Sequence, residues 1–182
     1  MNGALEWIGK VVEWLGAFIP RWVILDTSEA AIKYVKGNPV YCAPGKVHWY
    51  WPATTIWIAY PVARQSDRLE TQTMESADGV PFIVSGTLTY AVEDLSMLLP
   101  RTHSAMTTIV EIAQTAIHDV LCDLTWADMH NAQRKGTIKT LLRNSAQKEL
   151  EDYGVKVIRF KLNSLARCRV YRLSQSTSSE EN

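Results

Sequence analysis

The most constraining feature of this sequence is the stretch at residues 37–52, which reads GNPVYCAPGKVHWYWP. Its three prolines and two glycines fix or free the backbone at short intervals, so neither a helix nor a long strand can run through it. The stretch also carries four aromatic side chains, which gain free energy only by lying against apolar material. We therefore predict a shaped loop whose rings lie on the domain's own sheet or on a lipid surface.

The segment before this loop repeats every seven residues, reading EWIGKVV and then EWLGAFI over residues 6–19. On a helix, its charged residues and glycines fall along one narrow stripe, and apolar side chains cover most of the circumference. Because so wide an apolar face cannot be left in water, and because Pro20 ends the helix, we predict an amphipathic membrane-associating helix within residues 1–25. The side chains expected to contact lipid come from this segment and from the aromatic loop: Trp7, Ile8, Val11, Trp14, Leu15, Phe18, Trp22, Trp49 and Trp51.

The same helix has an alternative use, since its composition also suits a helix that packs on the protein's own core or on a second subunit. No stretch of the chain reaches the roughly 18 uninterrupted apolar residues of a transmembrane helix. Contact with lipid is therefore expected in the headgroup region or as a shallow insertion. Lys10 and Arg21 are too few basic residues to assign a side of the membrane.

After this segment the hydrophobic period changes to that of strands. Alternating apolar side chains mark four runs, at residues 30–35, 56–62, 80–92 and 155–165. In the third run, which follows a turn signal at residues 76–79, one face collects Phe82, Val84, Leu88, Tyr90 and Val92. Short turns between neighbouring runs predict a meander of mostly antiparallel strands.

Past Pro100 the period becomes helical, with Ser104 as the expected N-cap. One stripe collects the apolar residues of this first helix, namely Met106, Ile109, Val110, Ala113, Ile117, Val120, Leu121 and Leu124. A second helix is expected over residues 128–153, ending at Gly154. Together these elements predict an α+β fold, a mostly antiparallel twisted sheet with two packed helices. The expected division of the chain is a membrane-associating helix at residues 1–25, a domain at 26–166 and a polar flexible tail at 167–182.

Charge is unevenly placed along the chain, although its 19 basic and 19 acidic residues cancel. Residues 64–128 hold three basic and ten acidic side chains, whereas residues 134–172 hold eleven basic and three acidic ones. The basic segment has three interpretations: a solvated surface, a contact with the acidic half of a neighbouring copy, and a contact with an anionic surface. We predict no nucleic-acid partner, since the chain has no RNA-reading motif. The residues expected at an oligomer or anionic-surface contact are Arg134, Lys135, Lys139, Arg143 and Lys161.

Two pairs of side chains invite a chemical interpretation, and neither is favoured. His118 and Cys122 have the four-residue spacing that can present two metal ligands on one helix face, but no second ligand pair is evident. Cys42 lies near His48, yet no third group is placed to orient a nucleophile and a base. We therefore predict no catalytic residue, metal or cofactor, and hence a protein that is not an enzyme. The three cysteines cannot all pair, which favours a reducing compartment.

Three local patterns occur in a recognisable order. A glycine-bounded turn leads to PGKVHW at residues 44–49, an Asp-Gly turn precedes a strand that ends TYAVED at residues 89–94, and YGVKV at residues 153–157 opens the last strand. In this order and spacing, the patterns resemble the SPFH domain, also called the band-seven domain, of stomatins, prohibitins, flotillins and the HflK and HflC pair. The resemblance covers about residues 23–165.

The resemblance implies a membrane-associated scaffold without enzymatic activity, at a plasma or inner membrane, that oligomerises and organises or regulates membrane-protein complexes or lipid microdomains. The partners it implies are the lipid bilayer, further copies of the chain or SPFH relatives, and a membrane protease or channel. Family members usually continue into a long heptad-rich helix that drives ring assembly, and this chain ends in a polar tail, so a short member is expected. The alternative is a soluble assembly or inhibitor protein whose amphipathic N-terminus packs on a protein partner, such as a membrane protease or an SPFH relative.

Overall fold

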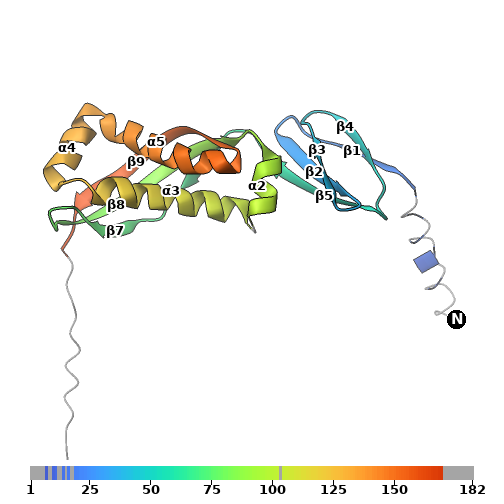
Figure 1. Ribbon diagram of the computed structural model, residues 1–182, viewed down its shortest axis with the longest axis horizontal. Coiled ribbons are helices and arrows are strands. Elements are labelled where there is room, and N and C mark those ends of the chain that lie inside the picture. The colour runs from blue at the N-terminus through green and yellow to red at the C-terminus, as the bar shows by residue number, and fades with distance from the viewer. Residues whose placement is uncertain are drawn as a thin grey trace, which may run out of the picture.

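The molecule has two parts, a small β end and a larger body (Figure 1). The computed structural model describes residues 19–102 and 104–169, together with Trp7, Lys10, Val11, Trp14 and Gly16. The β end consists of β1 to β5, at Arg21–Ile24, Glu29–Val35, Asn38–Cys42, Val47–Tyr50 and Thr55–Pro61. The body contains β6 to β9, at Gln65–Arg68, Gln72–Glu75, Pro81–Val92 and Val155–Arg167. Its helices are α2 to α5 and the short 3-10 helix η1, at Leu95–Arg101, Ala105–Cys122, Trp126–Lys135, Thr137–Leu150 and Glu151–Tyr153.

The β end is built on β2, which pairs antiparallel with β3 on one side and β5 on the other. β1 and β4 form a separate antiparallel ribbon. Successive side chains of a strand point to opposite faces, so β2 serves two clusters. Ala30 and Ile32 join the main core of the body, whereas Ala31 packs with Leu25 and Cys42 in a smaller cluster. The three-stranded sheet therefore contacts the body with one face and the ribbon with the other.

The loop predicted at residues 37–52 is wrong in part, because it contains two short strands, β3 and β4. Pro39 is compatible with β3 because β3 is an edge strand of its sheet, where proline is tolerated. The turn between the two strands uses Gly45, whose φ of 66° lies in the left-handed region. The expectation that no long strand crosses this stretch is confirmed, since the two strands have five and four residues.

The body is organised around β8, a strand of 12 residues. β9 pairs antiparallel with β8 along one side, while β6 and β7 pair with successive parts of its other side. The face predicted from the alternation is confirmed, because all of its members are buried: Phe82, Val84, Leu88, Tyr90 and Val92. The helices cover this face (Figure 1) and fill the core with Ile109, Ala113, Ile117, Leu142 and Ala146. The α+β fold with antiparallel sheets is confirmed.

The helices differ from the prediction in three places. The helix predicted over residues 128–153 is two helices, α4 and α5, because Gly136 adopts a φ of 75° and ends α4. The sequence pattern did not indicate α2, since seven residues are too few to show a period and Pro100 lies inside it. Met106 is exposed rather than part of the core stripe. Ser104 is the N-cap of α3 as predicted, although its side chain makes no capping hydrogen bond.

Gly154 joins the start of β9 to the start of α2. Its carbonyl oxygen accepts hydrogen bonds from the backbone N–H groups of Glu93 and Asp94, at 2.9 and 3.0 Å. Its φ is 69°, and a Cβ at this position would lie 2.5 Å from the Asp94 carbonyl oxygen, so any other residue would be strained and would force the backbone at Asp94 to shift. Asp94 caps α2 by accepting a 2.9 Å hydrogen bond from the N–H of Ser96. Because α2 also contacts β2 and β3, this junction links the body to the β end.

The amphipathic membrane-associating helix was predicted for the residues before β1. The described residues of this segment that are helical are Trp7, Lys10, Val11, Trp14 and Gly16. Within the described part of the chain, no helix is long and apolar enough to cross a membrane. Arg21–Ile24, which end the predicted 1–25 segment, form β1 and belong to the β end. Three predicted lipid contacts and most of the predicted tail lie outside the described residues, namely Ile8, Leu15, Phe18 and residues 170–182.

Candidate functional site

The ribbon of β1 and β4 carries apolar side chains on both of its faces. β1 reads RWVI and β4 reads VHWY, so large side chains of both strands point to each face. The register sets Trp22 opposite Trp49 and Ile24 opposite Val47, and opposed residues of an antiparallel pair point to the same side. These four residues, called here the outer face of the ribbon, point away from the small cluster under the ribbon.

The outer face is largely exposed to solvent. Trp22 and Ile24 expose 65% and 72% of their surface, and Val47 and Trp49 each expose 57%. The indole rings of Trp22 and Trp49 meet edge to face, with their centroids 5.3 Å apart. Trp51, just beyond β4, is also exposed. The outer face is therefore one continuous apolar surface rather than a set of scattered side chains.

The inner face of the ribbon holds it on the β end. Val23 of β1 and Trp57 of β5 pack against the small buried cluster. The Trp57 ring also lies beside two rings of β4, with centroid distances of 6.1 Å to His48 and 5.9 Å to Tyr50. In addition, the ammonium group of Lys33 on β2 donates a hydrogen bond to the Trp49 carbonyl oxygen at 3.4 Å. These contacts fix the orientation in which the ribbon presents its outer face.

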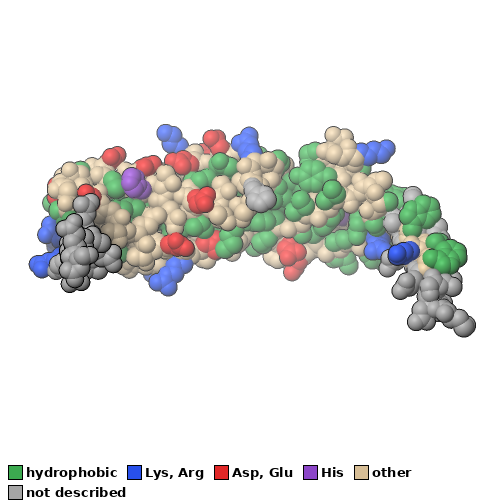
Figure 2. Space-filling view, turned by 90° about the horizontal axis from the view of Figure 1, so that it is seen from below, with side chains coloured by type: hydrophobic (Ala, Val, Ile, Leu, Met, Phe, Trp, Pro, Cys, Tyr) green, Lys and Arg blue, Asp and Glu red, His purple; other side chains and the backbone are tan. Residues whose placement is uncertain are grey.

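Further exposed tryptophans lie close to the ribbon along the chain. Trp7 and Trp14, in the segment that precedes β1, expose 60% and 63% of their surface. Figure 2 shows hydrophobic side chains gathered over the β end, whereas acidic side chains lie mainly over the body. Of the nine predicted lipid contacts, the six that are described are all exposed: Trp7, Val11, Trp14, Trp22, Trp49 and Trp51.

The five basic residues expected at a second contact surface do not form a single patch. Arg134 and Lys135 end α4, while Lys139 and Arg143 lie on α5. Lys161 lies on β9 opposite Thr87, on the sheet face that points away from the helices. The structure therefore separates Lys161 from the other four, and all five side chains are exposed.

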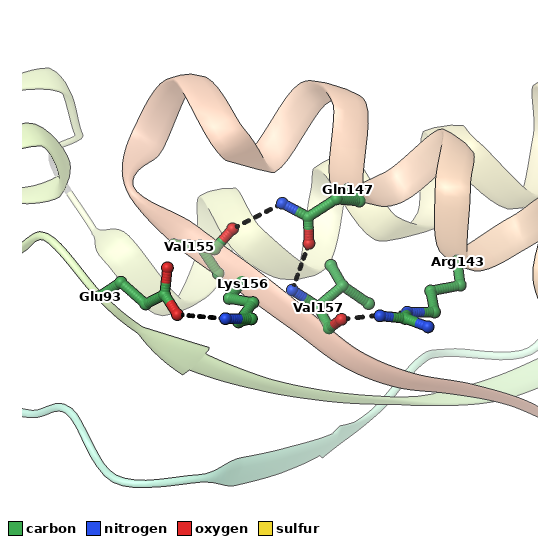
Figure 3. A network of polar contacts seen from close by, with 6 residues as sticks. All are labelled: Glu93, Arg143, Gln147, Val155, Lys156 and Val157. Atoms are coloured by element: carbon green, nitrogen blue, oxygen red, sulfur yellow. Dashed lines mark hydrogen bonds and ion pairs between the residues drawn. The ribbon is translucent and has the colours of Figure 1, made fainter.

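Arg143 has a structural role that its charge does not reveal (Figure 3). Its Nε donates a hydrogen bond to the Val157 carbonyl oxygen at 3.3 Å. The side chain of Gln147 completes this arrangement, accepting from the Val157 N–H at 2.7 Å and donating to the Val155 carbonyl oxygen at 3.4 Å. Two side chains of α5 thus satisfy the backbone at the start of β9. Beside them, Lys156 and Glu93 form an exposed ion pair with a 2.6 Å separation.

The residues considered for catalysis or metal binding make other contacts or are buried. His118 is exposed, and its Nδ1 atom lies 3.4 Å from Oδ1 of Asp119. Burial raises the pKa of the Cys122 thiol. Burial likewise raises the pKa of Cys42, and the nearby His48 ring has its Nε2 atom 3.1 Å from the Ala43 carbonyl oxygen. Among the described residues, no group of three or more His, Cys, Asp or Glu side chains is placed to hold a metal ion.

Comparison with known families identifies the class of protein to which this fold and surface belong. The model of the SPFH domain / Band 7 family matches residues 23–174, from the ribbon through the whole body. Because this match covers most of the sequence, the chain belongs to the SPFH domain / Band 7 family. The members of this family are generally membrane-associated, non-enzymatic scaffolds. A comparison with curated proteins found no match.

Sequence reasoning missed two members of the outer face, Ile24 and Val47. Ile24 belongs to a short apolar stretch, whereas Val47 lies between Lys46 and His48, and the predictions assigned neither residue to a strand. Their partnership depends on a register between strands that lie more than 20 residues apart in the sequence. The alternation of His48 with its two apolar neighbours was the available signal for a strand at this place.

Proposed function

We propose that this chain is a membrane-associated scaffold that attaches to a bilayer through the outer face of the ribbon. As an oligomer, it organises or regulates membrane-protein complexes or lipid microdomains. The observation that carries the proposal is the paired and exposed apolar surface formed by Trp22, Ile24, Val47 and Trp49. Family membership supports the coarser statement, that this is a membrane-associated protein.

The physical argument is one of unburied apolar area. Fully burying a single large apolar side chain stabilises by about 1.5–3 kcal/mol, so four of them on one face represent a substantial driving force for contact. The ribbon already packs on the β end with its inner face, so its outer face can be covered only by something outside the β end. Tryptophan is enriched at the boundary between lipid and water, because its indole combines an apolar ring with an N–H donor.

Charge and neighbouring residues support the same orientation. Arg21 and Lys46, both exposed, lie at the two ends of the ribbon, where cationic side chains interact favourably with anionic headgroups. Trp51 and the N-terminal Trp7 and Trp14 add exposed indoles near the same surface in the chain. We infer an interfacial attachment at a plasma or inner membrane, with the amphipathic N-terminal segment as its second element.

Flotation with vesicles of phosphatidylcholine and phosphatidylglycerol tests the attachment. The wild-type chain is expected to float with the vesicles, and the variant Trp22→Glu with Trp49→Glu is expected to partition about 100-fold more weakly, because two indoles no longer enter the interface. A second variant, Trp7→Glu with Trp14→Glu, measures the share of the N-terminal segment. The matched control is Met106→Glu with Leu141→Glu, which changes two exposed apolar side chains of the body.

A control that floats like the wild type, beside a ribbon variant that stays in solution, supports the proposal. If the ribbon variant floats as well as the wild type, the outer face is not the attachment site. If the wild-type chain stays in the soluble fraction in the presence of vesicles, the alternative gains support. That alternative is an assembly or inhibitor protein whose N-terminus packs on a protein partner. Circular dichroism of each variant confirms that the fold is retained.

A further inference from the structure

Within the described residues, the last strand of the body, β9, pairs with another strand on one side only. β8 forms backbone hydrogen bonds along that side. On the other side, side chains of α5 bond to the backbone at the start of β9, at Val155 and Val157. From Arg159 to Arg167, no described residue forms a backbone hydrogen bond with β9 on the side away from β8. This stretch, called here the open edge, leaves backbone donors and acceptors with which another strand can pair.

Cationic side chains lie along the open edge on the sheet face that points away from the helices. The register sets Arg159 opposite Thr89 of β8, and Lys161 opposite Thr87. These two threonines alternate with the buried residues of β8, so they point away from the face that the helices cover. Arg159 and Lys161 are exposed, and among the described residues neither forms an ion pair. Arg68 of β6 also lies opposite Thr87, so a third cation occupies the same face two strands away.

The helix side of the same edge is also basic. Arg143 of α5 reaches β9, since its Nε donates a hydrogen bond to the Val157 carbonyl oxygen at 3.3 Å. Lys139 lies one turn earlier on the same side of α5, because residues four apart share a helix face. Both cationic side chains are exposed. β9 contains no acidic residue, and those of β6 and β7 lie on the other side of β8. At the covered start of β9, Glu93 is already paired with Lys156.

We propose that the open edge of β9 binds an extended acidic segment of another protein, which adds to the sheet as a strand. Backbone hydrogen bonds hold the added strand, and charge selects which segment binds. The side chains of an added strand point alternately to the two faces of the sheet. On one face they lie beside Arg159 and Lys161, and on the other they point to the side of α5, where Lys139 and Arg143 are exposed. A run of Asp and Glu is therefore matched on both faces, whereas a basic strand is repelled on both.

The geometry favours a peptide over a lipid or a nucleic acid. The two cations of β9 lie on one face of the sheet and the two of α5 on the other, so a flat bilayer contacts only one pair at a time. The groups that lie between the two pairs are backbone donors and acceptors, which a peptide matches at the spacing of a strand. A polyanion without a peptide backbone would meet the charges and leave the edge unpaired.

Fluorescence anisotropy with labelled peptides tests the proposal without lipid, and hence apart from the proposed membrane attachment. The probe is a nine-residue peptide with blocked ends that repeats Glu-Glu-Val three times. The matched control peptide repeats Glu-Glu-Pro, which keeps the length and the charge but removes backbone donors along both edges of the peptide. The wild-type chain is expected to bind the valine peptide at least about 10-fold more tightly than the proline peptide, because only the former can pair along its whole length.

Substitutions on β9 test whether this edge is the binding site. Arg159→Glu with Lys161→Glu is expected to weaken binding of the valine peptide by about 30-fold, because two attractive contacts become repulsive. The milder variant Arg159→Gln with Lys161→Gln is expected to weaken it by about 5-fold. The control, Lys36→Glu with Lys46→Glu, reverses two exposed charges in the connections on either side of β3 and is expected to bind like the wild type.

Hydrogen exchange distinguishes an added strand from a contact through charge alone. With the valine peptide bound, amides within residues 159–167 of the wild type are expected to become more protected, because a paired edge exchanges more slowly. Equal affinity for the two peptides, or no added protection in this range, would overturn strand addition. A wild type that binds neither peptide, or a charge-reversed variant that binds like the wild type, would overturn the site itself. Circular dichroism shows whether each variant is folded, and the glutamine variant decides if the charge-reversed one is not.

Flotation of the same variants separates this surface from the membrane attachment. If Arg159→Glu with Lys161→Glu reduces flotation with the anionic vesicles as much as the ribbon variant does, and the valine peptide does not bind, the cations of β9 contact a bilayer and the proposal is wrong. A chain that binds the peptide but does not float retains this surface and loses the proposed attachment. A chain that floats but does not bind the peptide shows the reverse.

Discussion

Two outward-facing sheet surfaces of this molecule differ in the polarity of their side chains. On the body, the sheet face that points away from the helices carries hydroxyl and amide groups of β6, β8 and β9 that hydrogen-bond to one another from strand to strand. Ser85 and Ser164 lie 2.8 Å apart, Ser66 and Thr89 lie 2.9 Å apart, and Asn163 donates to Thr87 at 2.8 Å. On the β end, the outer face of the ribbon carries two indoles and two aliphatic side chains. The outer sheet face of the body thus satisfies its polar groups within the sheet, whereas the outer face of the ribbon leaves large apolar side chains exposed.

The body and the ribbon also differ in their contribution to stability. The body has a continuous core with several fully buried large side chains, among them Phe82, Leu88 and Tyr90. Among the described residues, the buried members of the cluster under the ribbon are Leu25, Ala31 and Cys42. Residues of the outer face contribute little to holding the fold, so their apolar character is better explained by a contact with another surface.

Paired substitutions in the two regions give the largest expected contrast. Leu88→Ala, in the middle of the core, is expected to lower the free energy of unfolding by about 3–4 kcal/mol, through lost burial and the cavity left behind. Ile24→Thr keeps a β-branched side chain on the exposed ribbon and is expected to change that free energy by less than about 0.5 kcal/mol. Urea denaturation followed by circular dichroism measures both. A large loss for Ile24→Thr would mean that the outer face is covered within the protein itself.

The next largest loss of stability is expected at Gly154, in the junction between the two regions. Gly154→Ala is expected to cost about 3 kcal/mol, because alanine at a φ of 69° is strained and its Cβ would collide with the Asp94 backbone. Gly136→Ala is the matched control, since Gly136 also has a left-handed φ but has no atom within 4 Å of a Cβ. It is expected to cost about 1 kcal/mol. Equal losses of unfolding free energy in the two variants would show that the close approach to Asp94 contributes nothing.

The sequence predicted those elements whose period persists over many residues. The runs that became β2, β5, β8 and β9 alternate long enough to be recognised, and the stripe of α3 repeats over five turns. β6 and β7 have only four residues each, QSDR and QTME, and Met74 is their one apolar side chain, so they offer no hydrophobic period. The merged prediction for α4 and α5 followed from a pattern that continues across Gly136, where one left-handed residue changes the direction of the chain.

The candidate surfaces were predictable only where they depend on residue type. Exposed Trp22, Trp49 and Trp51 could be named because tryptophan is informative wherever it occurs. Ile24 and Val47 could not, because their exposure follows from the pairing of β1 with β4. In the same way, the charge runs are visible in the sequence, whereas their placement on opposite edges of one sheet depends on the strand order around β8.

A partly buried polar cluster at the boundary of the two regions predicts an effect of alkaline pH. The Tyr90 hydroxyl donates to Asp67 at 2.8 Å, and Tyr60 of the β end lies within the same cluster. Burial, and then the hydrogen bond to Asp67, hold the pKa of Tyr90 well above the ordinary tyrosine value of about 10. The neutral hydroxyl is thus favoured in the folded state. Its contribution is complete below about pH 10 and is lost as the pH rises further, because the unfolded chain then releases its proton first.

The variant Tyr90→Phe tests this linkage. At neutral pH it is expected to lower the free energy of unfolding by about 1 kcal/mol, because Asp67 loses a hydrogen-bond donor. From about pH 9 to about pH 11, its stability is expected to fall less steeply than that of the wild type, since phenylalanine has no proton to release. Urea denaturation at several pH values measures both effects. Tyr41→Phe, on the exposed surface of β3, is the matched control. Parallel pH profiles for wild type and Tyr90→Phe would contradict the prediction.

The smallest effect is expected at the ion pair that joins the acidic and basic halves within one copy. Lys156 and Glu93 lie 2.6 Å apart, but their side chains are 58% and 60% exposed, so water and salt screen the attraction. A double-mutant cycle with Lys156→Met and Glu93→Gln is expected to give a coupling free energy of about 0.5 kcal/mol or less, measured by urea denaturation. A coupling several times larger would mean that the two halves are held together by charge within the copy.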